Sequence, residues 1–337
     1  MRRALIFVAA TAAAILAASW YPQLAAAPLR QSSSASQRLV LGVVRNDSML
    51  LPFAAFDGRK WSTPWPSVLG GRSAPSLPVS IATVPPKWWG GQVPADWNVW
   101  PRGADHSSRL TLQALAMIPV GTNRQVGFRT DHPAVLPAVP PFELPYPKVG
   151  IAIAGDATLR PIASVSALTG QWKMLAASLQ AEISMAEEQA IRALRGGPGW
   201  AHPFAPEQRA RVAAELEAWY VARQPESPIN LSYIEAVKKY PVLPADEGCG
   251  LETFVSGWVR HEDGLRDARS NLRATITYCD RRGVSYMLPF GELQLAGKSY
   301  WVVQMSGRDH ERYTVIEGRA EGVKYVAEYQ AAQLPPR

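Results

Sequence analysis

The chain has 337 residues, of which 47% are hydrophobic and 19% are charged, as in folded globular proteins and unlike disordered ones. Its formal net charge is +7, yet the lysines and arginines form none of the dense clusters that nucleic-acid-binding proteins carry. The composition therefore excludes a disordered chain, and we expect no nucleic-acid partner.

Residues 1–27 are predicted to be a secretory signal peptide. Arg2 and Arg3 supply a short positive region, and residues 4–18 carry no charge. An apolar stretch of about 15 residues suits a signal peptide, whereas a membrane-spanning helix needs about 20. Small residues at positions 25–27 then match a cleavage site. We expect a secreted or periplasmic protein without a membrane span in the mature chain; the alternative is an uncleaved N-terminal anchor.

Residues 28–37 are Ser-rich and predict a flexible lead-in, followed by a Trp/Pro-rich β domain over residues 38–147. Strands are predicted at 39–44 and 49–56, separated by a turn at 46–48. Pro52 inside the second strand favours an edge position or a bulge. Strand-like sequence returns at 110–120 and 125–130.

Between residues 61 and 101, prolines interrupt regular structure and tryptophans are interleaved with them. The candidate ligand-binding residues flank Gly90 and Gly91; they are Trp88, Trp89, Trp97 and Trp100. Exposed, coplanar indole rings can stack on a sugar or on a proline-rich peptide. The alternatives are core packing, which the usual burial of tryptophan favours, and a protein interface.

A second, α+β domain is predicted over residues 148–337, after a proline cluster at 133–147. Two strands are expected within 149–165. One long amphipathic helix is predicted at about 168–195, because apolar residues recur every three or four positions: Leu168, Trp172, Leu175, Leu179, Ile183, Ala186, Ala190 and Leu194. A second helix is predicted from Pro206, with Val212, Leu216 and Trp219 inward, whereas 231–240 fits either period.

The last ninety or so residues predict an antiparallel meander packed against the long helix. The expected strands are 254–259, 272–278, 284–295, 300–305, 313–316 and 324–329. The fold class is therefore α+β, β-rich and mainly antiparallel. Leu51-Pro52-Phe53 and Leu288-Pro289-Phe290 echo one another, but a single pair favours chance over a repeat.

The chain has two cysteines, Cys249 and Cys279. In an oxidising compartment an even number favours pairing, so we predict a disulfide; two free, buried thiols are the alternative. Two cysteines cannot complete a four-ligand zinc site without histidines, and no histidine lies at a suitable spacing. We therefore predict neither a metal site nor a cofactor.

No sequence motif names a reaction. The candidate catalytic carboxylates are Glu252, Asp280, Asp309 and Glu311. Asp309 and Glu311 would share a strand face, and paired carboxylates can hydrolyse glycans; the alternative is charge that keeps a sheet edge soluble. The sequence favours a noncatalytic exported protein that binds or organises an envelope or extracellular component, either polysaccharide or protein. The competing hypothesis is an extracytoplasmic hydrolase that uses carboxylates of the C-terminal sheet.

Overall fold

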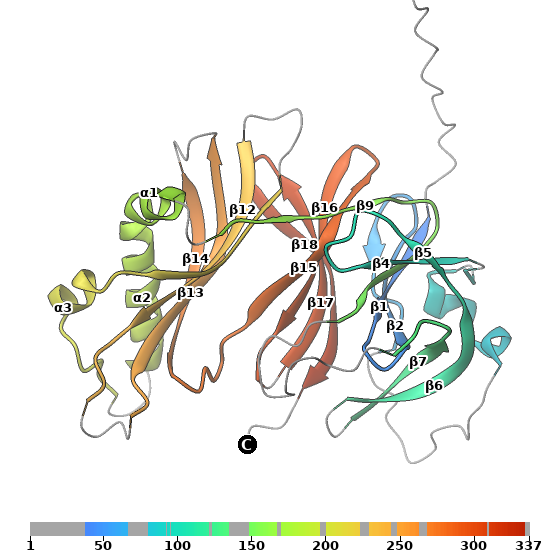
Figure 1. The fold of residues 1–337 in the computed structure, drawn as a ribbon, viewed down its shortest axis with the longest axis horizontal. Helices are drawn as coiled ribbons and strands as arrows, with labels where there is room; N and C mark the ends of the chain where they lie inside the picture. The colour runs from blue at the N-terminus through green and yellow to red at the C-terminus, as the bar shows by residue number, and fades with distance from the viewer. Residues whose placement is uncertain are drawn as a thin grey trace, which may run out of the picture. The chain divides into compact units, whose positions relative to one another are not determined.

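The computed structural model describes residues 38–66, 80–91, 93–94, 96–120, 123–134, 148–166, 170–195, 200–222, 229–243, 248–262, 268–308 and 310–333 (Figure 1). They belong to one compact unit, Ser36–Arg337. The predicted signal peptide and lead-in, and positions 135–147 of the proline cluster, lie outside the described residues.

The described strands form three sheets, and all their ladders are antiparallel. The N-terminal sheet has the order β5-β4-β8-β1-β2-β7-β6, and β3 also pairs with β2. Its strands are β1 (Leu39–Val44), β2 (Met49–Phe56), β3 (Trp61–Ser62), β4 (Trp97–Pro101), β5 (Ser108–Leu110), β6 (Leu112–Val120), β7 (Asn123–Thr130) and β8 (Gly150–Ala154). Two short 3-10 helices, η1 (Ile81–Thr83) and η2 (Pro86–Trp89), precede β4.

The middle and C-terminal sheets contain the longer strands. The middle sheet has the order β10-β11-β12-β13-β14, and the C-terminal sheet the order β18-β17-β16-β15-β9. Their strands are β9 (Leu159–Arg160), β10 (Ala163–Ser164), β11 (Glu215–Ala222), β12 (Ile229–Lys239), β13 (Leu251–Glu262), β14 (Arg269–Tyr278), β15 (Tyr286–Leu295), β16 (Lys298–Ser306), β17 (His310–Arg319) and β18 (Gly322–Gln333). The predicted β-rich, mainly antiparallel character is confirmed.

The short segment 150–164 contributes one strand to each of the three sheets. β8 pairs with β1 and β4, β9 pairs with β15, and β10 pairs with β11. The N-terminal sheet therefore extends beyond residue 147, where the sequence places a domain boundary.

Three clusters of buried apolar residues lie between the sheets and between the middle sheet and the helices. One joins the N-terminal sheet to a face of the C-terminal sheet. Another joins the opposite face of the C-terminal sheet to the middle sheet, and the last lies between the middle sheet and the helices. Strand β16 shows the consequence, because its Tyr300-Trp301-Val302-Val303 run alternates between the first two clusters. A strand covered on both faces has a continuous apolar run.

The prediction of one long helix at about 168–195 is not confirmed. The structure has α1 (Gly170–Ser178) and α2 (Gln180–Arg195), which Figure 1 draws as separate segments. The Ser178 hydroxyl donates to the carbonyl of Leu175 at 2.8 Å, and the same carbonyl also accepts the backbone N–H of Leu179 at 2.9 Å; a serine bond of this kind can bend a helix. The buried face of α2 also differs from the predicted one, because Ile191 is buried and Leu194, which was predicted to face inward, is exposed.

The second predicted helix is also too long. The helix α3 covers only Pro206–Arg211, and Leu216 and Trp219 lie on the strand β11. The stretch 231–240, which fitted either period, is largely the strand β12.

Pro52 lies at a bulge inside the sheet. Gly42 pairs with Pro52 and Leu41 with Ala54, so Phe53 is unpaired in this ladder. The echoing segment behaves alike, since Pro289 pairs with Val303 and Gly291 with Val302. Phe53 and Phe290 both pack on the ring of Tyr313, at centroid distances of 5.5 and 6.4 Å. The two similar triplets thus adopt the same local geometry.

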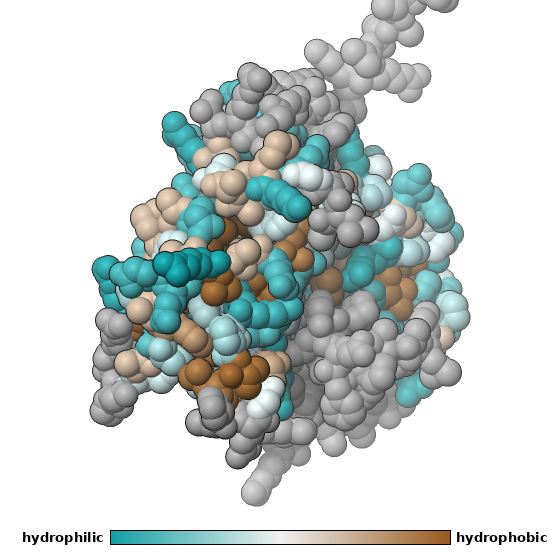
Figure 2. All heavy atoms as spheres, turned by 60° about the vertical axis from the view of Figure 1, so that its left-hand side comes forward, coloured by the Kyte–Doolittle hydropathy of each residue, from teal (hydrophilic) through white to brown (hydrophobic). Residues whose placement is uncertain are grey.

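The view in Figure 2 brings the α1–α2 side of Figure 1 forward, and apolar and polar surfaces are interspersed on it. Met174 of α1 and Met185 of α2 are exposed. Within the described ranges, no helix combines the length and apolar character needed to cross a membrane.

Candidate functional site

A cleft of about 490 Å³ opens at one end of the N-terminal sheet. Because β1 runs antiparallel to both β2 and β8, its first residues lie beside the last residues of these neighbours. These three strand ends, Asn98 of β4 and the loop after η2 line the cleft. The site is therefore built from the four adjacent strands β4, β8, β1 and β2, from Ser62 of β3 and from one loop.

The floor of the cleft is made of small or β-branched residues. Val40 pairs with Ala55 on one side and with Ala154 on the other, and all three are buried. Gly90, at φ 75°, passes so close that a Cβ at this position would lie 3.0 Å from the Cβ of Ala55. At Gly155, at φ 113°, a Cβ would lie 2.5 Å from the carbonyl oxygen of Arg38. The cleft thus depends on glycine and alanine at these positions.

The rim carries more acidic than basic groups. Asp57, Asp96 and Asp156 come from three separate segments, and Arg38 is the basic residue of the lining. The Asp57 carboxylate accepts the backbone N–H groups of Lys60 and Arg59, each at 2.9 Å, and these bonds hold its pKa below the ordinary value. Asp96 is paired with the exposed Arg109 at 2.7 Å. Three carboxylates and one guanidinium therefore surround an apolar floor.

The four candidate tryptophans do not form an exposed, coplanar surface. Trp89, Trp97 and Trp100 are only 2%, 1% and 7% exposed, and Trp88 is half-buried with its ring edge-on to Trp65. The planes of Trp89 and Trp97 are inclined by 58°. Of the four, Trp89 lines the cleft, beside Gly90. Three of the four candidate tryptophans therefore pack in the core, which is the alternative given above.

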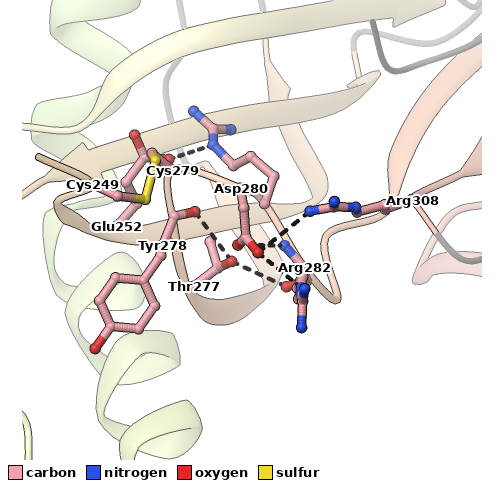
Figure 3. The surroundings of a disulfide bond; sticks show 9 residues. Cys249, Glu252, Thr277, Tyr278, Cys279, Asp280, Arg282 and Arg308 are labelled. Atoms are coloured by element: carbon pink, nitrogen blue, oxygen red, sulfur yellow. Dashed lines mark hydrogen bonds and ion pairs between the residues drawn. A yellow bond between two sulfur atoms is a disulfide. The ribbon is translucent and has the colours of Figure 1, made fainter. Parts of the chain in front are cut away.

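The candidate carboxylates of the C-terminal region have separate partners. Glu252 forms an ion pair with Arg281, and Asp280 pairs with Arg282 at 2.9 Å. Glu311 pairs with Lys148 at 2.7 Å. Asp309 lies outside the described residues. Glu252 and Asp280 are brought to the same end of the β13–β14 hairpin, where Asp280 pairs with both Arg282 and Arg308 (Figure 3). Glu252 pairs instead with Arg281, which also binds Glu217.

The predicted disulfide between Cys249 and Cys279 is confirmed, and it lies at this end of the hairpin (Figure 3). It joins the segment before β13 to the residue that follows β14. The ladder places Leu251 opposite Tyr278, so the bridge closes the hairpin just beyond its last pair.

Sequence reasoning missed a buried charge cluster beneath α2. The Glu187 carboxylate lies 2.7 Å from the ammonium of Lys238 on β12 and accepts the hydroxyls of Thr253 and Tyr240. Burial alone would raise the pKa of Glu187, but the hydrogen bonds from Lys238, Tyr240 and Thr253 hold it below its ordinary value. Arg209 of α3 lies 3.8 Å away. The cluster connects the helices to the middle sheet.

A second missed group is Glu235 of β12, which is 3% exposed and lies on the opposite face of the middle sheet. Its carboxyl accepts the backbone N–H of Met287 of β15 at 2.5 Å. Burial raises the pKa of Glu235 to about 8 and outweighs the hydrogen bond from Met287, which lowers it; the neighbouring Glu217 adds to the rise, and Arg281 opposes it. The signal that could have found it is an acidic residue between Tyr233 and Val237 in an apolar run.

Among the described residues, no group of three or more His, Cys, Asp or Glu side chains could hold a metal ion. Comparison with known proteins gives no further guide to the site. No family model, no curated protein and no solved structure matches this chain.

Proposed function

We propose that this is a noncatalytic binding protein, exported by residues 1–27, whose cleft in the N-terminal sheet holds a saccharide unit of an envelope or extracellular polysaccharide. The observation that carries the proposal is the cleft itself, with its apolar floor and its rim of carboxylates. Its volume of about 490 Å³ is within the range of small-molecule sites, which combine apolar lining with a few polar groups.

The chemistry of the lining matches a sugar. Carboxylate oxygens accept hydrogen bonds only, so Asp57, Asp96 and Asp156 suit hydroxyl donors. Asn98 and Ser62 can both donate and accept. The floor of Val40, Ala55 and Ala154 suits the apolar C–H face of a pyranose ring. The disulfide supports an oxidising, extracytoplasmic compartment.

The test is co-sedimentation of the protein lacking residues 1–27 with cell-wall sacculi and insoluble polysaccharides. Asn98→Trp adds bulk at an exposed position of the lining. Gln113→Trp is the matched control, because Gln113 is exposed on the same sheet and lines a separate cleft of about 410 Å³. We expect the first variant to weaken binding by about tenfold or more, which is about 1.4 kcal/mol, and the control to bind as the wild type does.

A second pair of variants tests the rim. Asp156→Asn removes one carboxylate of the cleft, whereas Asp47→Asn removes one from the separate cleft. Absence of wild-type binding to every polysaccharide would overturn the proposal, and so would equal binding by the Asn98 variant. Binding to sacculi that is lost after protease treatment would assign the ligand to a protein instead.

Export has its own test. The proposal expects the protein in the extracytoplasmic fraction with a mass that lacks residues 1–27. Recovery of the full-length chain from the cytoplasm would contradict this part of the proposal.

A further inference from the structure

The space between the middle and C-terminal sheets is apolar along most of its length. Tyr233 and Trp258 of the middle sheet pack there with Met287 and Trp301 of the C-terminal sheet. Glu235 lies on the same face as Tyr233, two residues further along β12. A buried carboxyl group therefore lies in a largely apolar junction.

Glu235 makes a direct connection between the two sheets. Its carboxyl accepts the backbone N–H of Met287 at 2.5 Å. Strand β15 pairs with β16 along its length but with β9 only at Glu292 and Leu293. The side of β15 at Met287 therefore has no neighbouring strand among the described residues, and the Glu235 side chain takes that place.

Arg281, the cation whose charge acts on this carboxyl, is already shared. Arg281 binds Glu217 through two bonds of 2.8 and 2.9 Å and also pairs with Glu252. Glu217 is the unpaired residue of a bulge in β11, since Leu216 pairs with Ala236 and Ala218 with Glu235. An ionised Glu235 would thus be a third negative charge beside one guanidinium, and taking an uncompensated charge out of water is costly.

The remaining titratable neighbours do not supply a positive charge. The groups that face Glu235 are Glu217 and Tyr220 from β11, Tyr233 from β12, Tyr286 from β15, and Arg281 from the turn after β14. Burial also raises the pKa of Tyr220, to about 12, so this phenol stays neutral wherever the fold is stable. Glu217 and Arg281 are the charged groups that act on Glu235 directly, whereas Arg102 and Arg312 act on the neighbouring Tyr220 and Tyr233.

We propose that the contact between β12 and β15 is a proton-dependent latch, closed while Glu235 is protonated and opening locally when Glu235 ionises. The opened state hydrates the carboxylate and releases the Met287 amide, without unfolding either sheet. The pKa of Glu235 is about 8 in the closed state, against 4.5 for an exposed carboxyl, and these two values set the pH range over which the contact opens. Between these two values the opening equilibrium grows by about tenfold per pH unit, and above pH 8 it levels off.

Hydrogen exchange of single amides tests this directly. After correction for intrinsic exchange, the protection of the Met287 amide should fall by about tenfold between pH 6 and pH 7. In Glu235→Gln the protection should change by less than about twofold. Glu292→Gln is the matched control, because Glu292 is a buried carboxyl on β15, the strand that contains Met287. In this variant the protection of the Met287 amide should still fall by about tenfold.

The amide of Val315, in the core of the C-terminal sheet, reports on global opening. If its protection falls in parallel with that of Met287, the pH dependence belongs to global unfolding and the latch is overturned. A pH-independent Met287 amide in the wild type overturns it as well.

If Glu235→Gln does not fold, the test is a carbon-13 NMR titration of the side-chain carboxyls in the wild-type protein. A carboxyl with a midpoint near pH 8 supports the latch, and titration of every carboxyl below pH 6 contradicts it.

Discussion

The Glu187–Lys238 pair gives a test of how burial sets the energy of a charge pair. Lys238 and its neighbour Lys239 both form ion pairs, with N–O distances of 2.7 and 2.8 Å. Their surroundings differ, because the side chains of the first pair are 0% and 2% exposed and those of Lys239–Glu215 are 51% and 61% exposed. The two lysines are thus matched in sequence position and geometry but not in burial.

We expect Lys238→Met to destabilise the fold by about 3–5 kcal/mol, because it leaves the Glu187 carboxylate buried without its main counter-charge. Glu187→Gln should cost a similar amount, since it leaves a buried ammonium. The double variant removes both charges, and the amide oxygen at 187 can still accept the hydroxyls of Thr253 and Tyr240. It should therefore cost less than either single variant. Lys239→Met should cost no more than about 1 kcal/mol.

The assay is urea unfolding followed by tryptophan fluorescence, with the disulfide intact and with m-values compared between variants. A double-mutant cycle then gives the coupling energy of the pair. Additive costs of the two single variants would refute the reasoning, because they would mean that neither charge depends on the other. Equal costs for Lys238→Met and Lys239→Met would refute it as well.

Three further outcomes are expected. The pKa of Glu187 is held below its ordinary value of 4.5, so the stabilisation of the fold by its ionised form is complete above pH 4.5 and is lost as the pH falls. The urea midpoint of the wild type should therefore decline below about pH 4.5, and the decline should be smaller in Glu187→Gln. Replacing Cys249 and Cys279 by serine should lower the free energy of unfolding by about 3–4 kcal/mol, given the sequence separation of 30, measured by the same urea titration. Gly291→Ala should cost about 1–3 kcal/mol, because the new Cβ would lie 2.6 Å from Leu159 Cγ; a melting temperature equal to that of the wild type would contradict this expectation.

Strands were predictable where the local sequence pattern fits the pairing and burial that the neighbouring strands impose. The alternation of Leu272, Ala274 and Ile276 with polar residues predicts β14, and these three side chains are partly buried. Pro52 predicts an edge or a bulge, and the structure has the bulge, opposite Leu41 and Gly42 of β1. A proline cannot donate to a ladder, so a local rule was sufficient at this position.

Helices were less predictable, because periodicity does not encode where a helix ends. The apolar spacing continues across Leu179, yet α1 ends at Ser178. In β11 the spacing of Leu216 and Trp219 fits a helix, while the exposed Glu215 beside it also fits a strand. Pairing with β12 decides between them, and this partner is distant in the sequence.

The cleft illustrates a different limit. The dipeptides Asp57-Gly58 and Gly155-Asp156 are turn signals in the sequence, and Gly90 lies between the tryptophans. Nothing local indicates that these turns meet, because they are about a hundred residues apart. They come together only because β1 pairs with both β2 and β8, and strand order is a property of the whole sheet.

Strand β12 shows why the buried charges escaped notice and how they could have been found. If residues 229–239 are assigned to a strand, Ile234, Ala236 and Lys238 share one face and Tyr233 and Glu235 share the other. Each charged residue then falls in line with apolar neighbours, and a buried charge requires a partner. In the structure those partners are Glu187 for Lys238 and the Met287 amide for Glu235. A charge in phase with the apolar residues of a strand that is covered on both faces is therefore the sequence signal for groups of this kind.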